Sequence, residues 1–189
     1  MINWSRHTNT SLAVHQLHSQ GGIAYPTEAA WGLGRDPFSF SAVKKILHLK
    51  NRPEHKGVIL IACDWQQFAL FTEGLTGGQL GRLQQPNSKP TTWLIPHNGV
   101  APDWIVGGHD TLAVRVTTHP VAACLCRLFG GPIVSTSANP QGLSEATNAL
   151  KVRGYFGRNI DAITSGTTGS ASAPSEIRHL LSGRVMRKG

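Results

Sequence analysis

The chain has 189 residues, enough for one domain with a hydrophobic core, and its 40% hydrophobic and 15% charged residues are typical of a globular protein. No apolar run is long enough to span a bilayer, so no membrane partner is expected. The formal net charge of +8 indicates a polyanionic partner, such as nucleic acid, nucleotide or phosphate, or else a basic surface that serves solubility.

The N-terminal stretch and the cysteines bear on the compartment. Residues 1–12 are polar and lack the apolar centre of a signal peptide, so we expect a cytoplasmic protein. Cys63, Cys124 and Cys126 form no disulfide framework, and the spacing of the last two is poor for a zinc knuckle. We expect buried or half-buried thiols and no protein metal site.

Apolar runs alternate with helical patterns along the chain, which predicts an α/β fold with a mixed sheet and helices packed on it. In chain order we expect a helix over 12–20, a strand over 23–25, a helix over 41–50, a buried strand over 58–62 and a helix opened by a capping box at 64–67. We then expect at most a weak helix within 72–89, strands over 92–95 and 111–117, a helix over 120–129 and a short strand over 133–134 that leads into a polar turn. A helix over 145–156 and strands over 160–163 and 183–187 complete the pattern.

Two polar clusters in the first half of the chain follow predicted elements. Thr27 and Glu28 leave the first strand at Pro26, and the glycines of 31–34 could let the backbone approach a ligand, although a helix-capping turn explains this stretch as well. Lys50, Arg52 and Lys56 place three cations between a helix and a buried strand. Because several converging cations are what a triphosphate needs, this is the best phosphate-binding candidate, although no Walker motif is present.

Two further clusters lie in the second half. Arg115 is on the non-apolar side of an alternating strand and could bind the carboxylate of a small substrate, or meet a protein carboxylate or a solvated edge. Residues 135–139, with sequence STSAN, could bind phosphate oxygens, a ribose or an amino acid. A hydroxyl-rich turn that satisfies its own backbone is the alternative, and the absence of a G-x-S-x-G elbow argues against a serine nucleophile.

Six stretches resemble the YrdC family, and in particular its short bacterial form: AYPTEAAWGLGRDP, LKNRPEHKGVILIA, KPTTWLIP, LAVRVTTHP, PIVSTSAN and PSEIRHLLSGRVMRKG. They occur in the family's order from about Tyr25 to the end of the chain. The resemblance implies a single YrdC-like domain over 1–189, in which a twisted sheet with flanking helices bends around a positively charged concave cleft. It also implies that L-threonine, bicarbonate and ATP are converted to threonylcarbamoyl-AMP and pyrophosphate.

The resemblance further implies site residues and partners. Threonine would be bound by Thr27, Arg115, Ser135 and Ser175; the nucleotide would be bound by Lys50, Arg52, Lys56, Ser137, Asn139 and Arg187, with the first three acting in catalysis. We expect Mg²⁺ to accompany ATP, with Glu28 as the nearest carboxylate. The product would serve N6-threonylcarbamoyladenosine formation at position 37 of tRNAs reading ANN codons, through proteins of the TsaD, TsaB and TsaE types.

Two other functions are compatible with the basic composition. A double-stranded RNA- or tRNA-binding module without catalysis would use the net charge and a cationic concave face. However, no RRM, KH or arginine-rich motif is present, and only 7% of the residues are aromatic. A general nucleotide-binding regulator would bind ATP without regard to threonine.

Overall fold

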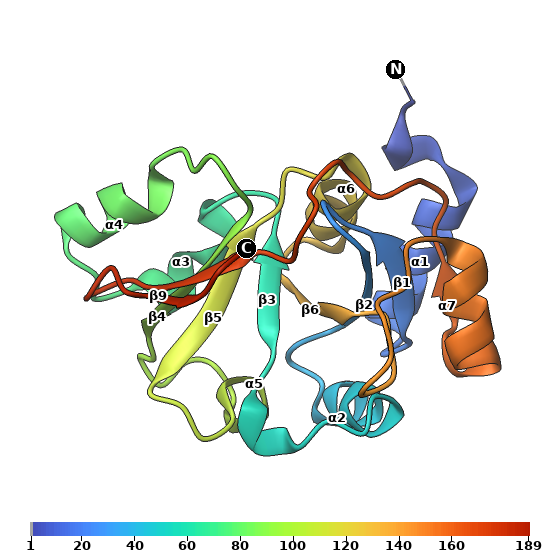
Figure 1. The fold of residues 1–189 in the computed structure, drawn as a ribbon, viewed down its shortest axis with the longest axis horizontal. Helices are drawn as coiled ribbons and strands as arrows, with labels where there is room; N and C mark the ends of the chain where they lie inside the picture. Colours follow the sequence, from blue (N-terminus) through green and yellow to red (C-terminus); the bar gives the residue numbers. More distant parts are fainter. Residues whose placement is uncertain (1) are drawn as a thin grey trace.

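The computed structural model describes residues 2–189, which fold around one nine-stranded mixed sheet (Figure 1). The strands are β1 (Ile23–Pro26), β2 (Trp31–Arg35), β3 (Ile59–Ala62), β4 (Thr91–Pro96), β5 (Thr111–Val116), β6 (Ile133–Ser137), β7 (Ala162–Ile163), β8 (Glu176–His179) and β9 (Val185–Arg187). Their order across the sheet is β7-β1-β2-β6-β3-β5-β4-β8-β9. The predicted α/β class with a mixed sheet is confirmed.

Helices pack on both faces of this sheet. The α-helices are α1 (Thr8–His18), α2 (Phe40–Leu49), α3 (Ala69–Thr72), α4 (Gly77–Gln84), α5 (Asp103–Val106), α6 (Pro120–Phe129) and α7 (Ala149–Phe156). Short 3-10 helices are η1 (Trp4–Arg6), η2 (Glu54–Lys56), η3 (Gln66–Phe68) and η4 (Gly157–Asn159). In Figure 1, α3 and α4 lie beside one end of the sheet and α1 and α7 beside the other. Within residues 2–189, no helix is both long and apolar enough to cross a membrane.

The two faces of the sheet are covered to different extents. One face carries the larger core, to which α2, α3, α4, α5 and α7 all contribute buried apolar side chains. On the other face, α1 and α6 form a smaller core with β1, β3, β6 and β7 only. Over β5, β4 and β8 this second face is left to line a cavity, with Ala113, Leu94 and Ile177 on its floor.

Register explains how residues far apart in sequence reach that floor. Leu94 is opposite Ala113, Ala113 is opposite Ile59, and Ile59 is opposite Ser135. Side chains at paired positions point to the same face, so these four form one row across β4, β5, β3 and β6. The row brings a hydroxyl from β6 next to the apolar floor of the cavity.

Several boundaries differ from the sequence predictions because side chains cap the helices. α1 begins at Thr8 rather than 12, since the ring Nδ1 of His7 accepts from the amide of Asn9 at 3.3 Å. α7 begins at Ala149 rather than 145, because Asn148 Oδ1 accepts from the amide of Lys151 at 2.8 Å. The capping box predicted at 64–67 forms only in part: Asp64 Oδ1 accepts from the amide of Gln67 at 3.1 Å, but Gln67 Oε1 accepts from the amide of Cys63, and the helix there is the short η3. Cys124 and Cys126 are buried and Cys63 is half-buried, as predicted, and all three are free thiols.

Two predicted turns are strands. The glycine-rich stretch at 31–35 is β2, and the strand predicted at 133–134 runs on to Ser137 as β6, antiparallel to β2. A Cβ on Gly34 would lie 2.8 Å from the ring of Tyr25 and 3.2 Å from the carbonyl oxygen of Val134. Glycine is therefore required there for strand packing and not for ligand approach. β8 was not predicted at all.

Candidate functional site

The uncovered half of the second sheet face holds a cavity of about 390 Å³. Eight of the ten residues predicted for the site line it: Thr27, Arg52, Lys56, Arg115, Ser135, Ser137, Ser175 and Arg187. Lys50 and Asn139 do not line it and lie behind its wall. Four of the lining side chains are Lys or Arg and two are Glu, so the cavity has an excess of positive charge.

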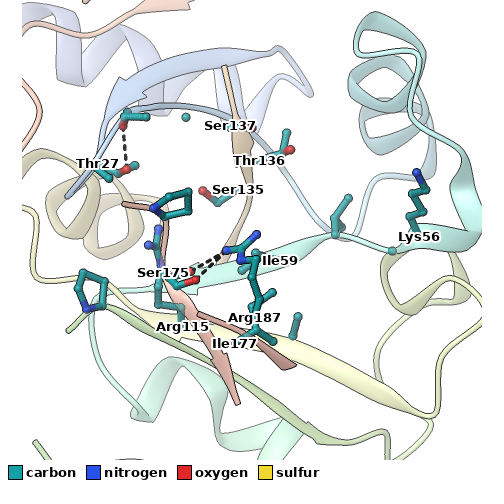
Figure 2. Close-up of a pocket in the computed structure, with 18 of the residues that line it drawn as sticks. Thr27, Lys56, Ile59, Arg115, Ser135, Thr136, Ser137, Ser175, Ile177 and Arg187 are labelled. Atoms are coloured by element: carbon teal, nitrogen blue, oxygen red, sulfur yellow. Dashed lines mark hydrogen bonds between the residues drawn. The ribbon is translucent and has the colours of Figure 1, made fainter. Parts of the chain in front are cut away.

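The cavity has two chemically different ends. In Figure 2, Thr27, Arg115, Ser175 and Arg187 lie around one part of the pocket, and Lys56 stands apart on the opposite side. Ser135, Thr136 and Ser137 of β6 lie between them. The arrangement can hold an elongated ligand with one anionic group near the two arginines and another near Lys56.

Arg115 is held by a buried carboxylate. Its Nη1 lies 3.4 Å from Oε2 of Glu28, and each residue is 9% exposed. The other oxygen of Glu28, Oε1, accepts from the Thr117 hydroxyl at 2.6 Å and from the Thr118 amide at 3.1 Å. Burial alone would raise the pKa of Glu28, but the charge of Arg115 and these hydrogen bonds lower it below its usual value. Glu28 is therefore ionised across the neutral range.

Ser175 and Arg187 are joined where the last strands meet the cavity. Arg187 Nη2 donates to the carbonyl oxygen of Ser175 at 2.7 Å (Figure 2). The hydroxyls of Ser175 and Thr92 lie 2.8 Å apart. At the other wall, the Thr27 hydroxyl donates to the carbonyl oxygen of Ala30 at 2.8 Å and closes the turn after β1. These contacts fix the positions of the hydroxyls of Thr27 and Ser175, two of the three predicted to bind threonine.

Arg52 shapes the loop that presents Lys56. Its Nε and Nη2 donate to the carbonyl oxygen of Gly57 at 3.1 and 3.0 Å, and Nη2 also donates to that of Lys56 at 3.2 Å. Gly57 has φ +55°, and a Cβ there would lie 2.7 Å from the carbonyl oxygen of Val106. Lys56 itself is exposed, and among the described residues its ammonium has no hydrogen-bond or ion-pair partner. It is the cation best placed to meet a ligand anion.

Lys50 contacts the loop that follows β6. Its ammonium donates to the carbonyl oxygens of Ser137 and Asn139, the latter at 2.6 Å, and to Asn139 Oδ1 at 3.2 Å. Asn139 Nδ2 in turn donates to the carbonyl oxygen of Leu143 at 2.6 Å. In this structure both residues shape the wall of the cavity, whereas the sequence predicted direct contact with the nucleotide.

The protonation of Lys50 makes its contacts with the 137–139 loop pH-dependent. Burial, together with the positive charge of Arg52, lowers its pKa to about 8, against the opposing charge of Glu145. A protonated amine has three N–H donors for the three oxygens, whereas a neutral amine has two. We expect KM for ATP to rise as pH increases through about 8, because the 137–139 loop loses a hydrogen bond.

The same deprotonation should increase the stability of the fold while it weakens binding. The folded pKa of Lys50 lies below the unfolded value of 10.5, so between those values the unfolded chain binds more protons and this residue's contribution to stability increases with pH. We would measure KM for ATP and the melting temperature from pH 6.5 to 9.5, with Lys50→Met as the control that lacks both slopes. Equal slopes in the variant and the parent would contradict the assignment to Lys50.

The cavity offers few groups for a metal ion. No cluster of three or more His, Cys, Asp or Glu side chains that could hold one occurs within residues 2–189. Of the two carboxylates at the cavity, Glu28 is engaged by Arg115, Thr117 and Thr118, which leaves Glu145. Glu145 was not predicted as a site residue from the sequence. Nor was Ile59 predicted as a floor residue, although alternation within 58–62 could have placed it.

Sequence comparison identifies related proteins over nearly the whole chain. A family model described as Sua5/YciO/YrdC, telomere recombination, matches residues 15–189. A threonylcarbamoyl-AMP synthase of Cellvibrio japonicus (strain Ueda107) is 52% identical over 187 residues, which cover 99% of each chain. A threonylcarbamoyl-AMP synthase of Halorhodospira halophila is 47% identical over 93% of this chain and 92% of its own.

Solved structures agree with these sequence matches. P. abyssi Sua5, crystallised with L-threonine, superposes with a TM-score of 0.83 at 28% identity; the match covers 90% of this chain and half of that longer one. E. coli YciO superposes with a TM-score of 0.78 at 21% identity, covering 96% of this chain and 88% of its own, which is a likeness of fold.

Proposed function

The chain belongs to the Sua5/YciO/YrdC family, and on that basis we propose that it is a nucleotidyltransferase that forms threonylcarbamoyl-AMP and pyrophosphate from L-threonine, bicarbonate and ATP. The observation that carries the proposal is that one cavity is lined by the buried Arg115 on one side and by the ammonium of Lys56, which has no partner among the described residues, on the other. The relatives favour this enzyme over an RNA-binding module without catalysis.

We propose that threonine binds at the arginine end. Arg115 meets Glu28 through Nη1, and its Nε has no hydrogen-bond partner among the described residues. Because Nε is buried, a substrate carboxylate would reach the guanidinium from the cavity at Nη2, which makes no hydrogen bond or ion pair with the described residues. Thr27, Ser135 and Ser175 supply nearby hydroxyls for the amino acid. The L-threonine bound to P. abyssi Sua5 supports this class of ligand.

The nucleotide then occupies the rest of the cavity. Lys56 and Arg52 are the cations for the phosphates at one side, Arg187 reaches in from β9, and Ser137 borders the path between them. Lys50 and Asn139 support the wall behind Ser137. We propose that the first four of these residues contact the nucleotide and that the last two support it from behind the wall.

In this reaction the protein contributes mainly by positioning the reactants and by stabilising negative charge. The threonine amine and bicarbonate give a carbamate and water; a carbamate oxygen then attacks the α-phosphorus of ATP, and the bond to the departing pyrophosphate breaks. Two anions must approach each other, so cations on both sides lower the barrier. Holding the carbamate in line with the α-phosphate removes much of the entropic cost of the encounter.

We propose Mg²⁺ as the companion of ATP. Mg²⁺ usually keeps several waters and is held by substrate phosphates with one or two carboxylates. Glu145 is the carboxylate free to take part, since both oxygens of Glu28 are directed at protein groups. When bound, the ion would neutralise phosphate charge.

The product is a reactive adenylate, so a second protein must consume it. We propose transfer to adenosine 37 of tRNAs reading ANN codons by proteins of the TsaD, TsaB and TsaE types, in the cytoplasm. Direct binding of tRNA is compatible with the net charge of +8.

The proposal is tested by detecting the adenylate by mass with each substrate omitted in turn. We expect product and pyrophosphate only when threonine, bicarbonate and ATP are all present. Steeply salt-dependent RNA binding without turnover would support the RNA-binding module, and ATP binding that ignores threonine would support a regulator.

A further inference from the structure

We propose that Glu28 is a positioning residue for the reaction, which fixes the Arg115 guanidinium in the orientation that receives the substrate carboxylate, and that Thr117 acts on the same guanidinium through Glu28. The identity of that carboxylate rests on the proposed function. Arg115, Glu28 and Thr117 form a chain of three side chains, of which Arg115 and Glu28 line the cavity and Thr117 does not.

The contacts of Glu28 are directional. Oε1 accepts from the Thr117 hydroxyl at 2.6 Å and the Thr118 amide at 3.1 Å, which fixes the plane of the carboxylate. The Thr117 hydroxyl in turn accepts from the amide of His119 at 3.2 Å, so its own position is set by the start of α6. With Oε1 held from behind, Oε2 is left to face Arg115.

The pair orients Arg115 without using all of its hydrogen-bonding capacity. The 3.4 Å between Nη1 and Oε2 is longer than the 2.7–2.9 Å of a strong charged hydrogen bond. Only Nη1 of the guanidinium is engaged; Nε is buried without a partner, and Nη2 makes no hydrogen bond or ion pair within the described chain, so it is the nitrogen left for a ligand. A substrate carboxylate can therefore add to the guanidinium instead of displacing Glu28.

The Glu28–Arg115 ion pair also has an electrostatic role, in addition to orienting the guanidinium. Arg187 is exposed overall, but partial desolvation at the cavity lowers its pKa; the charge of Glu145 opposes this shift and the positive charge of Arg115 adds to it. Arg115 and Arg187 lie around the same part of the pocket, so their like charges repel each other (Figure 2). The negative charge of Glu28 allows both to remain at the same end of the cavity, where an uncompensated buried arginine would turn away.

Thr117→Val tests the inference, because Thr117 is 2% exposed and does not line the cavity. Valine keeps the shape but leaves Oε1 with one donor fewer. We expect KM for threonine to rise roughly tenfold, the scale of one lost hydrogen bond to a charged group. KM for ATP should stay within about twofold, since the phosphate end is untouched.

Thr164→Val is the matched control. Thr164 is 3% exposed, lines no cavity, and its hydroxyl has no partner among the described residues, so the same substitution removes no contact there. Its kinetic constants should equal those of the parent. Glu28→Gln is the second variant: its amide N–H would oppose the Nη1–H of Arg115, and KM for threonine should rise more than in Thr117→Val.

The outcomes are distinguishable. An unchanged KM for threonine in Thr117→Val, or equal rises for threonine and ATP, overturns the positioning role. Recovery of Glu28→Gln by excess Mg²⁺ would assign Glu28 to the metal and also overturn it. If the parent protein makes no threonine-dependent product, the proposed function fails instead. A selective rise for threonine in both variants, with Thr164→Val unchanged, supports the inference.

Discussion

Lys56→Ala is expected to reduce threonine-dependent pyrophosphate release by about a hundredfold or more, the usual scale for removing one charge aligned with a reacting phosphate. Lys56 is exposed at the cavity, and within residues 2–189 its ammonium contacts no acceptor. Its charge is therefore available to an anionic ligand, which we propose to be ATP. Because the side chain supports no contact of the fold, the melting temperature should stay within about 1–2 °C of the parent value.

Lys45→Ala is the control for net charge. Lys45 is exposed on α2 and does not line the cavity, so the variant loses the same charge without losing a ligand contact. Rates should be measured at saturating threonine over a series of ATP concentrations, beside Lys56→Arg, which keeps the charge. A parental rate in Lys56→Ala would mean that the phosphates lie elsewhere.

Local sequence patterns were enough to predict which side chains reach the cavity where strand alternation or a nearby cluster of cations determines their position. The alternation in 111–117 placed Leu112 and Val114 in the core and Arg115 on the opposite face, and the structure confirms that arrangement. The cation cluster at 50–56 also predicted correctly that Arg52 and Lys56 would reach a common cavity. In each case the decisive information lay within a few residues.

The contacts of Glu28 and Lys50 and the presence of β2 could not be predicted from the sequence, because each depends on packing between segments that are far apart along the chain. Glu28 was considered as a metal neighbour, yet its partners Arg115 and Thr117 lie on or beside β5, far along the chain. Similarly, a lysine at a helix end does not reveal that its ammonium contacts the loop after β6, as Lys50 does. β2 was missed because its glycines suit a turn by propensity, and only close packing between β1 and β6 favours a strand.

Arg115→Ala is expected to abolish measurable threonine-dependent turnover and also to destabilise the fold. Removing the guanidinium leaves Glu28 as a buried charge without its cation, which typically costs about 3 kcal/mol. For a chain of this length that corresponds to a fall in melting temperature of about 6–12 °C. Thermal unfolding and product detection by mass should be measured on the same preparation.

The pH dependence of that deficit separates a lost ion pair from a simple packing defect. In the parent, Arg115 helps to lower the pKa of Glu28 below its unfolded value of 4.5, so the pair's stabilisation is present above that pH and is lost as pH falls. In Arg115→Ala, burial without the cation raises the pKa of Glu28, and protonation at low pH relieves the cost. The difference in melting temperature between the two should therefore be larger at pH 8 than at pH 5. Adding Glu28→Gln to Arg115→Ala should restore stability but not turnover; a deficit that is the same at both pH values would mean that lost packing, and not charge, is responsible.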